Sequence, residues 1–219
     1  AAYTSMNLHL GEKTSAKAGL RYEYTTSNLG SETVKNIVDR KYGNLFPTFF
    51  LSHTISEKST VNLSYNRRIT RPTFNNMAPF VYFVDPNTFF SGNAALQPAT
   101  ANSVKGDFIL KRAVFSLSYT AEKNTITNFT PQVDPASNKQ TLAAENQKGR
   151  KLLSASITLP ITVTTWWNMQ NNLVANKTDL SARYKGEALS VKMMNLNISS
   201  TQSFTLPKNF STEVSAFYL

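Results

Sequence analysis

The side chains best suited to bind a ligand lie in one long polar and aromatic stretch. Arg68 and Arg71 stand close to Pro72, and Tyr82 and Asp85 follow among several aromatic residues. Arginine can hold an acidic group through paired hydrogen bonds, and tyrosine combines an apolar ring with a hydroxyl. We therefore predict that any ligand contact made here involves Arg68, Arg71, Tyr82 and Asp85.

The aromatic rings of the same stretch allow two interpretations. A loop of this length needs an internal core, so the rings can pack the loop onto itself or onto its neighbours. They can also present a contact surface to a ligand. The residues concerned are Phe80, Tyr82, Phe83, Phe89 and Phe90.

Catalytic and metal-binding patterns find little support. The chain has two histidines, His9 and His53, and no Ser, Asp or second His stands at a spacing that indicates a nucleophile and base. The thirteen acidic residues form no EF-hand or His-Glu-x-x-His pattern, and there is no cysteine. We expect no enzyme, no metal site and no cofactor.

A net charge of +10 at first suggests nucleic acid or another anionic partner. The basic residues are scattered, however, and the densest group is Arg67, Arg68 and Arg71. Recognition-helix, zinc-finger and RNA-binding motifs are missing. We expect no nucleic-acid partner and interpret these residues as charges of a solvated wall and its loops.

The elements that must position these residues are strands, separated by breaks of two kinds. Short and long breaks alternate strictly, which is typical of a transmembrane β-barrel with periplasmic turns and extracellular loops. The expected strands cover 15–27, 46–56, 59–69, 103–111, 113–123, 149–160, 163–175, 189–205 and 209–219, pairing antiparallel in sequence order. The long breaks are Ser27 to Asn44, Thr70 to Asn102, Asn124 to Lys148 and Asn176 to Ala188.

Residues within the strands alternate in polarity with period two, so each strand has one apolar and one polar face. A soluble sandwich would alternate in the same way, and the asymmetry of the loops favours a barrel. We expect Ala18, Leu20, Tyr22, Leu63, Tyr65, Leu117, Tyr119, Ala155 and Ile157 to face lipid. We expect Lys17, Arg21, Glu23, Asn62, Ser64, Ser116, Ser118, Ser154 and Ser156 to face the lumen.

Aromatic residues near the strand ends agree with membrane interfaces, where amphipathic rings are favoured. No apolar run reaches 18 residues, so a membrane-spanning role would have to be carried by strands. The chain opens without a signal peptide and stops in mid-strand, which suggests an internal stretch of a longer protein. The aromatic residues are Tyr22, Tyr24, Phe49, Phe50, Trp166, Trp167 and Tyr218.

The longest break resembles the signature of the TonB-dependent-receptor-like outer-membrane β-barrel family of Bacteroidetes. The resemblance rests on the Arg71-Pro72 pair, the apolar segment from Pro79, the Gly92-Asn93 turn and the Leu96-Gln97-Pro98 step. It covers most of the chain and is strongest from about Tyr65 to Lys105. The Gly92-Asn93 pair is expected to turn with positive φ.

The resemblance implies an all-β, antiparallel up-and-down barrel of roughly 22 strands, of which residues 1–219 supply about ten within a single domain. It also implies an outer-membrane receptor of a Gram-negative bacterium that imports a ligand. Its partners would be the lipid bilayer, the unidentified imported ligand and a TonB system that acts through a plug not recognisable in this chain.

Two alternatives remain. One is a non-transporting outer-membrane or surface β-protein that binds a partner. The other is a barrel-embedded hydrolase, which would need a lumen-facing nucleophile and base. For the receptor, we expect that shortening Arg71 to Gln97 leaves the barrel folded, because no ladder hydrogen bonds would be lost.

Overall fold

The computed structural model describes residues 1–30, 32–134, 136–184 and 187–218. Its strands form one sheet of twelve, and ten of them pair antiparallel in chain order except that β4 is followed by β7. No helix in the described ranges is long and apolar enough to cross a membrane. The ten are β1 (Ala2–His9), β2 (Thr14–Leu29), β3 (Val38–Ser56), β4 (Ser59–Thr70), β7 (Ala99–Leu110), β8 (Ala113–Asp134), β9 (Lys139–Thr162), β10 (Trp167–Tyr184), β11 (Glu187–Thr205) and β12 (Ser211–Tyr218).

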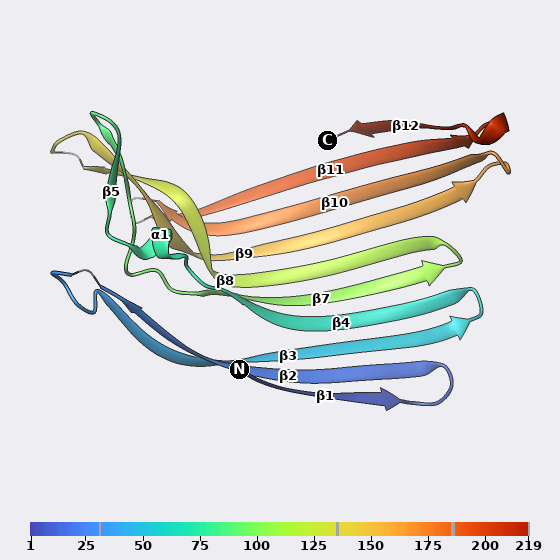
Figure 1. Cartoon of the computed structure of the whole chain (residues 1–219), viewed down its shortest axis with the longest axis horizontal. Coiled ribbons are helices and arrows are strands. Elements are labelled where there is room, and N and C mark those ends of the chain that lie inside the picture. Colours follow the sequence, from blue (N-terminus) through green and yellow to red (C-terminus); the bar gives the residue numbers. More distant parts are fainter. Residues whose placement is uncertain (31, 135, 185–186, 219) are drawn as a thin grey trace.

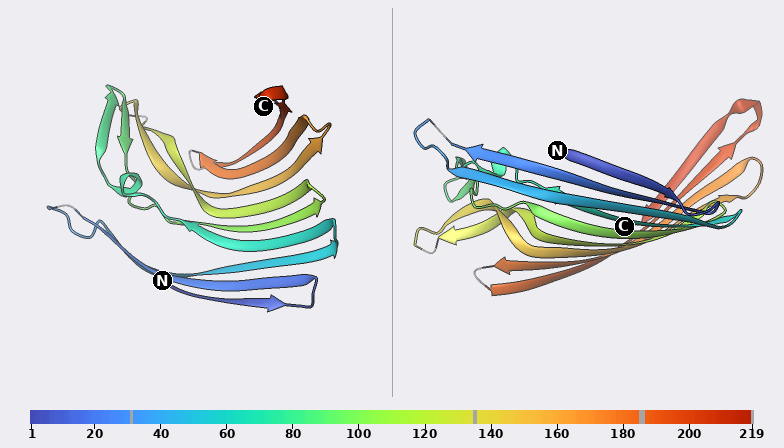
Figure 2. Two further views of the ribbon diagram at one scale, coloured as in Figure 1. Left: turned by 45° about the vertical axis from the view of Figure 1, so that its right-hand side comes forward. Right: turned by 90° about the horizontal axis from the view of Figure 1, so that it is seen from below.

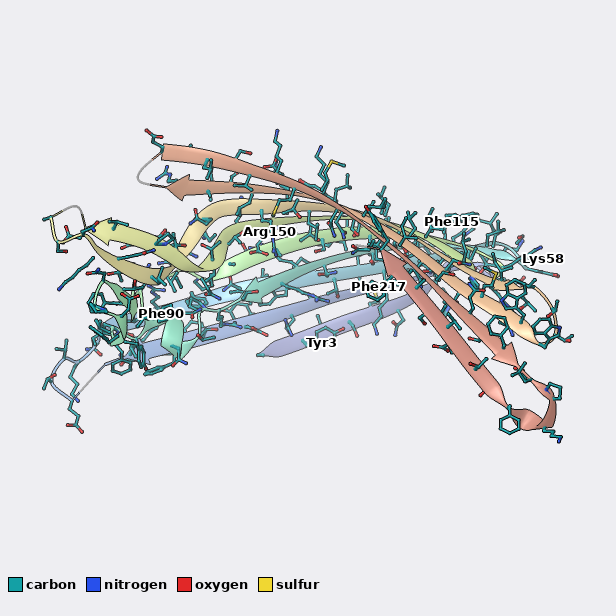
Figure 3. All side chains as sticks on the ribbon, turned by 90° about the horizontal axis from the view of Figure 1, so that it is seen from above. Tyr3, Lys58, Phe90, Phe115, Arg150 and Phe217 are labelled. Carbon is teal, nitrogen blue, oxygen red and sulfur yellow. The ribbon has the colours of Figure 1, made fainter. Side chains whose placement is uncertain are left out.

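The predicted antiparallel order of neighbouring segments is confirmed. The turns that join β1 to β2, β3 to β4, β7 to β8, β9 to β10 and β11 to β12 lie at one end of the sheet, here called the short-turn end, and the other connections lie at the opposite, loop end (Figure 1). At the short-turn end, Gly11 has φ +85°, which a glycine adopts without steric cost. Figure 3 shows Lys58 at the short-turn end and Phe90 at the opposite, loop end.

The strands extend further toward the loop end than the sequence predicted. The expected loop Asn124 to Lys148 is wrong, because β8 and β9 continue as a paired hairpin up to Asp134 and Lys139. The expected loop Asn176 to Ala188 is wrong in the same way, since β10 and β11 pair up to Tyr184 and Glu187. The β8–β9 extension has no regular apolar stripe, so period two was not visible in it. On β10, Leu180 and Ala182 do alternate with Asp179, Ser181 and Arg183, and sequence reasoning missed this alternation.

The pairing register places the predicted apolar positions on one face. Leu51, Leu63, Gly106, Leu117 and Ala155 stand directly opposite one another on five successive strands. The neighbouring row contains Ala18, Tyr65, Tyr119 and Phe49 in the same manner. Because directly opposed residues share a face, the alternation read from the sequence defines one continuous apolar face.

The sheet is curved and open. Strands β1 and β12 each pair on one side only, and Figure 2 shows a trough rather than a closed cylinder. The polar face carries Lys17, Arg21 and Glu23 on β2, opposite Phe50, Phe46 and Asn44 on β3. Figure 3 labels Tyr3 on one edge strand and Phe217 on the other.

The connection between β4 and β7 has structure of its own. It contains α1 (Phe74–Met77), begun by a Thr73 side-chain cap, and a hairpin of β5 (Val81–Asp85) and β6 (Thr88–Ser91). Strand β6 pairs parallel with the upper part of β9, with Phe90 opposite Leu142. The premise that this connection contributes no ladder hydrogen bonds is therefore wrong.

The end of the connection is anchored to the polar face of the sheet. Leu96 is completely buried, and its carbonyl accepts a hydrogen bond from the Arg40 guanidinium on β3. The same guanidinium donates to the Ala94 carbonyl at 2.7 Å. The side-chain amide of Asn146 on β9 donates to the backbone carbonyl of Gln97 at 2.8 Å. The connection is thus tied to both β3 and β9.

The conformation of Gly92 differs from the prediction. Among the glycines of the described ranges, only Gly11 has a positive φ, so Gly92 does not serve a left-handed turn. A Cβ on Gly92 would instead overlap the carbonyl of Ala78. Glycine is needed here because two backbone segments approach each other closely.

Candidate ligand-contact site

A pocket of about 270 Å³ lies where α1, the β5–β6 hairpin and the upper parts of β8 and β9 meet. Strand β6 of the hairpin pairs with β9. The backbone N–H of Asn93 donates a hydrogen bond to the backbone carbonyl of Asn76 in α1 at 2.7 Å, which holds α1 beside the end of β6. The lining consists of Asn75, Asn76, Tyr82, Phe90, Ser91, Gly92, Asn128, Leu142, Ala143 and Ala144.

The described lining of this pocket contains aromatic rings, amides and a hydroxyl but no ionisable acid or base other than the Tyr82 phenol. Such a surface stacks against a flat or apolar part of a ligand, and its amides both donate and accept hydrogen bonds. A charged group would find no counter-ion there. The pocket therefore suits an uncharged part of a ligand.

Of the four residues predicted to contact a ligand, only Tyr82 belongs to this lining. Its side chain remains 59% exposed, so the ring is free to meet a ligand at the pocket edge. Arg68 lies at the loop end of β4, exposed and opposite Ala101. The structure therefore does not bring the four predicted residues together.

Arg71 and Asp85 make internal contacts. The Arg71 guanidinium donates to the Glu23 carboxylate at 2.7 Å and to the Thr25 hydroxyl at 3.0 Å, both on β2. This pair ties the start of the connection to the polar face. Asp85 accepts a hydrogen bond from the Asn87 amide at 2.8 Å and thereby closes the β5–β6 turn.

The aromatic residues of the connection divide between the two predicted roles. The rings of Phe83 and Phe89 pack edge to face at 5.4 Å, and Phe74 and Phe80 lie 6.0 Å apart. These contacts pack the connection onto itself. Phe90 lines the pocket together with Tyr82.

Sequence reasoning missed the pocket residues contributed by β8 and β9. Asn128, Leu142 and Ala143 fall in the range that was expected to be a loop. Threonine, isoleucine and valine are frequent between Thr125 and Val133, and this strand propensity is the signal that could have revealed the extended hairpin. In the described ranges, no group of three or more His, Asp or Glu is arranged to hold a metal ion.

The turn closed by Asp85 should respond to pH. The Asn87 amide, followed by the Thr88 hydroxyl, holds the pKa of the Asp85 carboxyl below its ordinary value. A lowered pKa means that the ionised form stabilises the turn above the ordinary pKa and that this contribution is lost as the pH falls through the lowered one. We expect the hydrogen-exchange protection factor of the Asn87 backbone amide to fall as the pH falls through the lowered pKa of Asp85. Protection should be pH-independent in Asp85→Asn, and an equal pH response in this variant would contradict the assignment.

Aromatic residues mark both ends of the apolar face. At the short-turn end, the rings of Trp166, Trp167 and Phe204 cluster within 6.3 Å of one another. Toward the loop end, Tyr65 and Tyr119 flank Val104 on the same face. One predicted aromatic differs, because Phe50 stands on the polar face opposite Lys17.

An apolar face bounded by two aromatic levels, with tight turns at one end and a docked connection at the other, defines the wall of a membrane β-barrel. The chain belongs to the outer membrane protein beta-barrel family, whose model matches residues 1–219. It lies in the outer membrane of a Gram-negative bacterium. The short turns are accordingly periplasmic, and the loop end is extracellular.

Solved structures of a siderophore receptor, an iron transporter and a ferric enterobactin receptor share this fold. The siderophore receptor PirA from Pseudomonas aeruginosa matches with a TM-score of 0.62 and 16% identity, over 97% of this chain and 43% of that one. The FrpB iron transporter from Neisseria meningitidis matches with a TM-score of 0.70 and 14% identity, over 98% and 32%.

The ferric enterobactin receptor PfeA from Pseudomonas aeruginosa, as a mutant bound to enterobactin, matches with a TM-score of 0.55 and 15% identity, over 97% and 38%. No curated protein matches the chain. The chain therefore spans less than half the length of each of these three proteins.

Proposed function

We propose that this chain is the barrel-wall portion of a TonB-dependent receptor of the Bacteroidetes type that imports a ligand across the outer membrane. The observation that carries this proposal is the docked connection of residues 71–98. Hydrogen bonds from Arg40 and Asn146 hold it over the polar face at the extracellular end. A segment in this place lines the route of an entering ligand.

In this proposal the pocket near Tyr82 is the first contact for an uncharged part of the ligand. Arg68 is exposed on β4 and available to an acidic part. Residues 1–219 belong to one barrel domain, and energy reaches it through a plug that contacts TonB. The alternative is an outer-membrane protein of the same fold that binds its partner without importing it.

Replacing Tyr82 tests the ligand contact. We expect Tyr82→Ala in the full-length protein to weaken binding roughly tenfold, because a stacking ring and its hydroxyl are lost. Ferric enterobactin and a labelled uncharged oligosaccharide are the probes, and binding is measured by titration calorimetry. Val81→Ala, an exposed neighbour outside the pocket, is the matched control. Equal affinity of wild type and Tyr82→Ala for a probe that binds would show that Tyr82 does not contribute to the ligand contact.

Deleting the TonB gene tests the transport step separately. Uptake of the bound probe by whole cells should stop, whereas binding to the purified protein should remain unchanged. Binding without uptake in wild-type cells would favour the non-transporting alternative.

A further inference from the structure

Three lysines share the apolar face of the wall near its extracellular end. Lys151 on β9 and Lys192 on β11 both stand directly opposite Asp179 on β10. Lys177 on β10 stands opposite Leu153 and Met194, in the adjacent row. Opposed residues share a face, so Lys151, Lys177 and Lys192, here called the basic patch, project on the side of Leu117 and Ala155.

The height of the patch is set by the residues below it. Lys177 occupies the same row as Tyr119, the outer aromatic level, and Lys151 lies one row further out. Lys151 and Ile161 lie ten positions apart on β9, which is about 34 Å along a strand at about 3.4 Å per residue. A strand tilt near 40° reduces this to about 25 Å, the height of the apolar band of such barrels. The patch therefore stands at the outer headgroup level.

The charges of the patch have little compensation within the protein. All three lysines are exposed, and none of them takes part in an ion pair in the described ranges. Asp179 is the acidic residue between them, and its carboxylate accepts a hydrogen bond from the Ser190 hydroxyl at 3.1 Å. Arg150, the inward neighbour of Lys151, is by contrast paired with Glu122 at 2.9 Å.

We propose that the basic patch binds the phosphate groups of an anionic lipid in the outer leaflet of the membrane. Three ammonium groups and one carboxylate leave a net positive surface, which matches a phosphate-bearing headgroup. Exposed Leu153 and Met194 flank Lys177 in its own row. The next row toward the middle of the membrane is apolar, with Ala155, Ala175 and exposed Leu196, and suits the acyl chains of the same molecule. Continuity of the charged and apolar surfaces selects a lipid over a soluble partner.

The test measures lipid binding by the folded full-length protein. Native mass spectrometry in mild detergent follows titration with lipid A, the phosphate-bearing glycolipid of Gram-negative outer leaflets, and with dephosphorylated lipid A. We expect Lys151→Gln, Lys177→Gln and Lys192→Gln to weaken binding of lipid A by about fivefold for each lysine removed. Arginine at the same three positions should restore it.

The matched control removes the same charge elsewhere, with Lys13→Gln, Lys17→Gln and Lys58→Gln in the turns and on the polar face. We expect its lipid binding to equal that of the wild type. Unchanged binding in the patch variant, or equal loss in the control, overturns the proposal. Displacement of lipid A by inorganic phosphate at equal concentration also overturns it, since the site would then be one for free phosphate. Heat-modifiability on gels reports folding, and the three single variants replace the triple variant if it does not fold.

Discussion

Lysine in place of Leu63 is expected to lower the free energy of unfolding from lipid vesicles by about 2 to 4 kcal/mol, the cost of a charged side chain near the middle of the bilayer. Leu63 stands on the apolar face between Leu51 and Gly106 and is 41% exposed in the isolated wall. In the membrane this exposed surface faces hydrocarbon. Leu117→Lys, one strand beyond Gly106, should cost a similar amount.

The matched control is lysine at Ser154 on the polar face. Ser154 stands opposite Ser118 and Asn176, so a new charge there meets polar groups and water. Ser64 and Ser118 are poorer controls because both stand opposite Lys105, and like charges in direct opposition repel. The measurement is reversible urea unfolding of the full-length protein in vesicles. Equal costs on the two faces would show that the facing is wrong.

Leu96→Ala should weaken the docking of the connection by about 2 to 5 kcal/mol, as expected when a large side chain is removed from a fully buried site. Leu96 is 0% exposed. In the described part of the chain, Leu96 and Phe46 on β3 are the largest side chains that are fully buried. The Gln97 amide, which donates to Asn146 at 2.6 Å, reports the docking. Its hydrogen-exchange protection should fall, while the amides of β2 and β3 keep theirs.

Leu96→Met, which conserves volume, and Val81→Ala, which changes an exposed site, should leave the protection of Gln97 nearly unchanged. If Leu96→Ala unfolds the wall as well, the connection is part of one cooperative unit with the barrel. If it changes neither, Leu96 does not hold the connection in place.

Strand order, and which residues share a face, could be predicted from the sequence because the membrane imposes a period of two on every strand that crosses it. Leu117 and Ser118 illustrate this, since each residue type fits only one of the two environments. Above the membrane both faces of a strand meet water, so the period is no longer imposed, and it is absent from the β8–β9 extension. For this reason the pairing of Thr127 with Glu145 was mistaken for a loop.

The candidate site was less predictable because it is made by contacts between segments distant in sequence. Arg71 was selected for its chemistry, but its role depends on Glu23, which the register of β2 and β3 places within reach. Asn128 has no distinctive sequence context and becomes a pocket residue only because α1 and β6 pack beside it. Residue type indicates what a side chain can bind, but the packing decides what it contacts.

The parallel pairing of β6 with β9 implies an order of events during biogenesis. The β8–β9 hairpin joins residues close in sequence, from Asp134 and Lys139 upward, whereas Thr88 must find Gln140 across β7 and β8. Local pairings form before distant ones because they lose less chain entropy. The wall is therefore assembled first, and the connection then settles onto it, so insertion into the bilayer and the shaping of the entrance are successive steps.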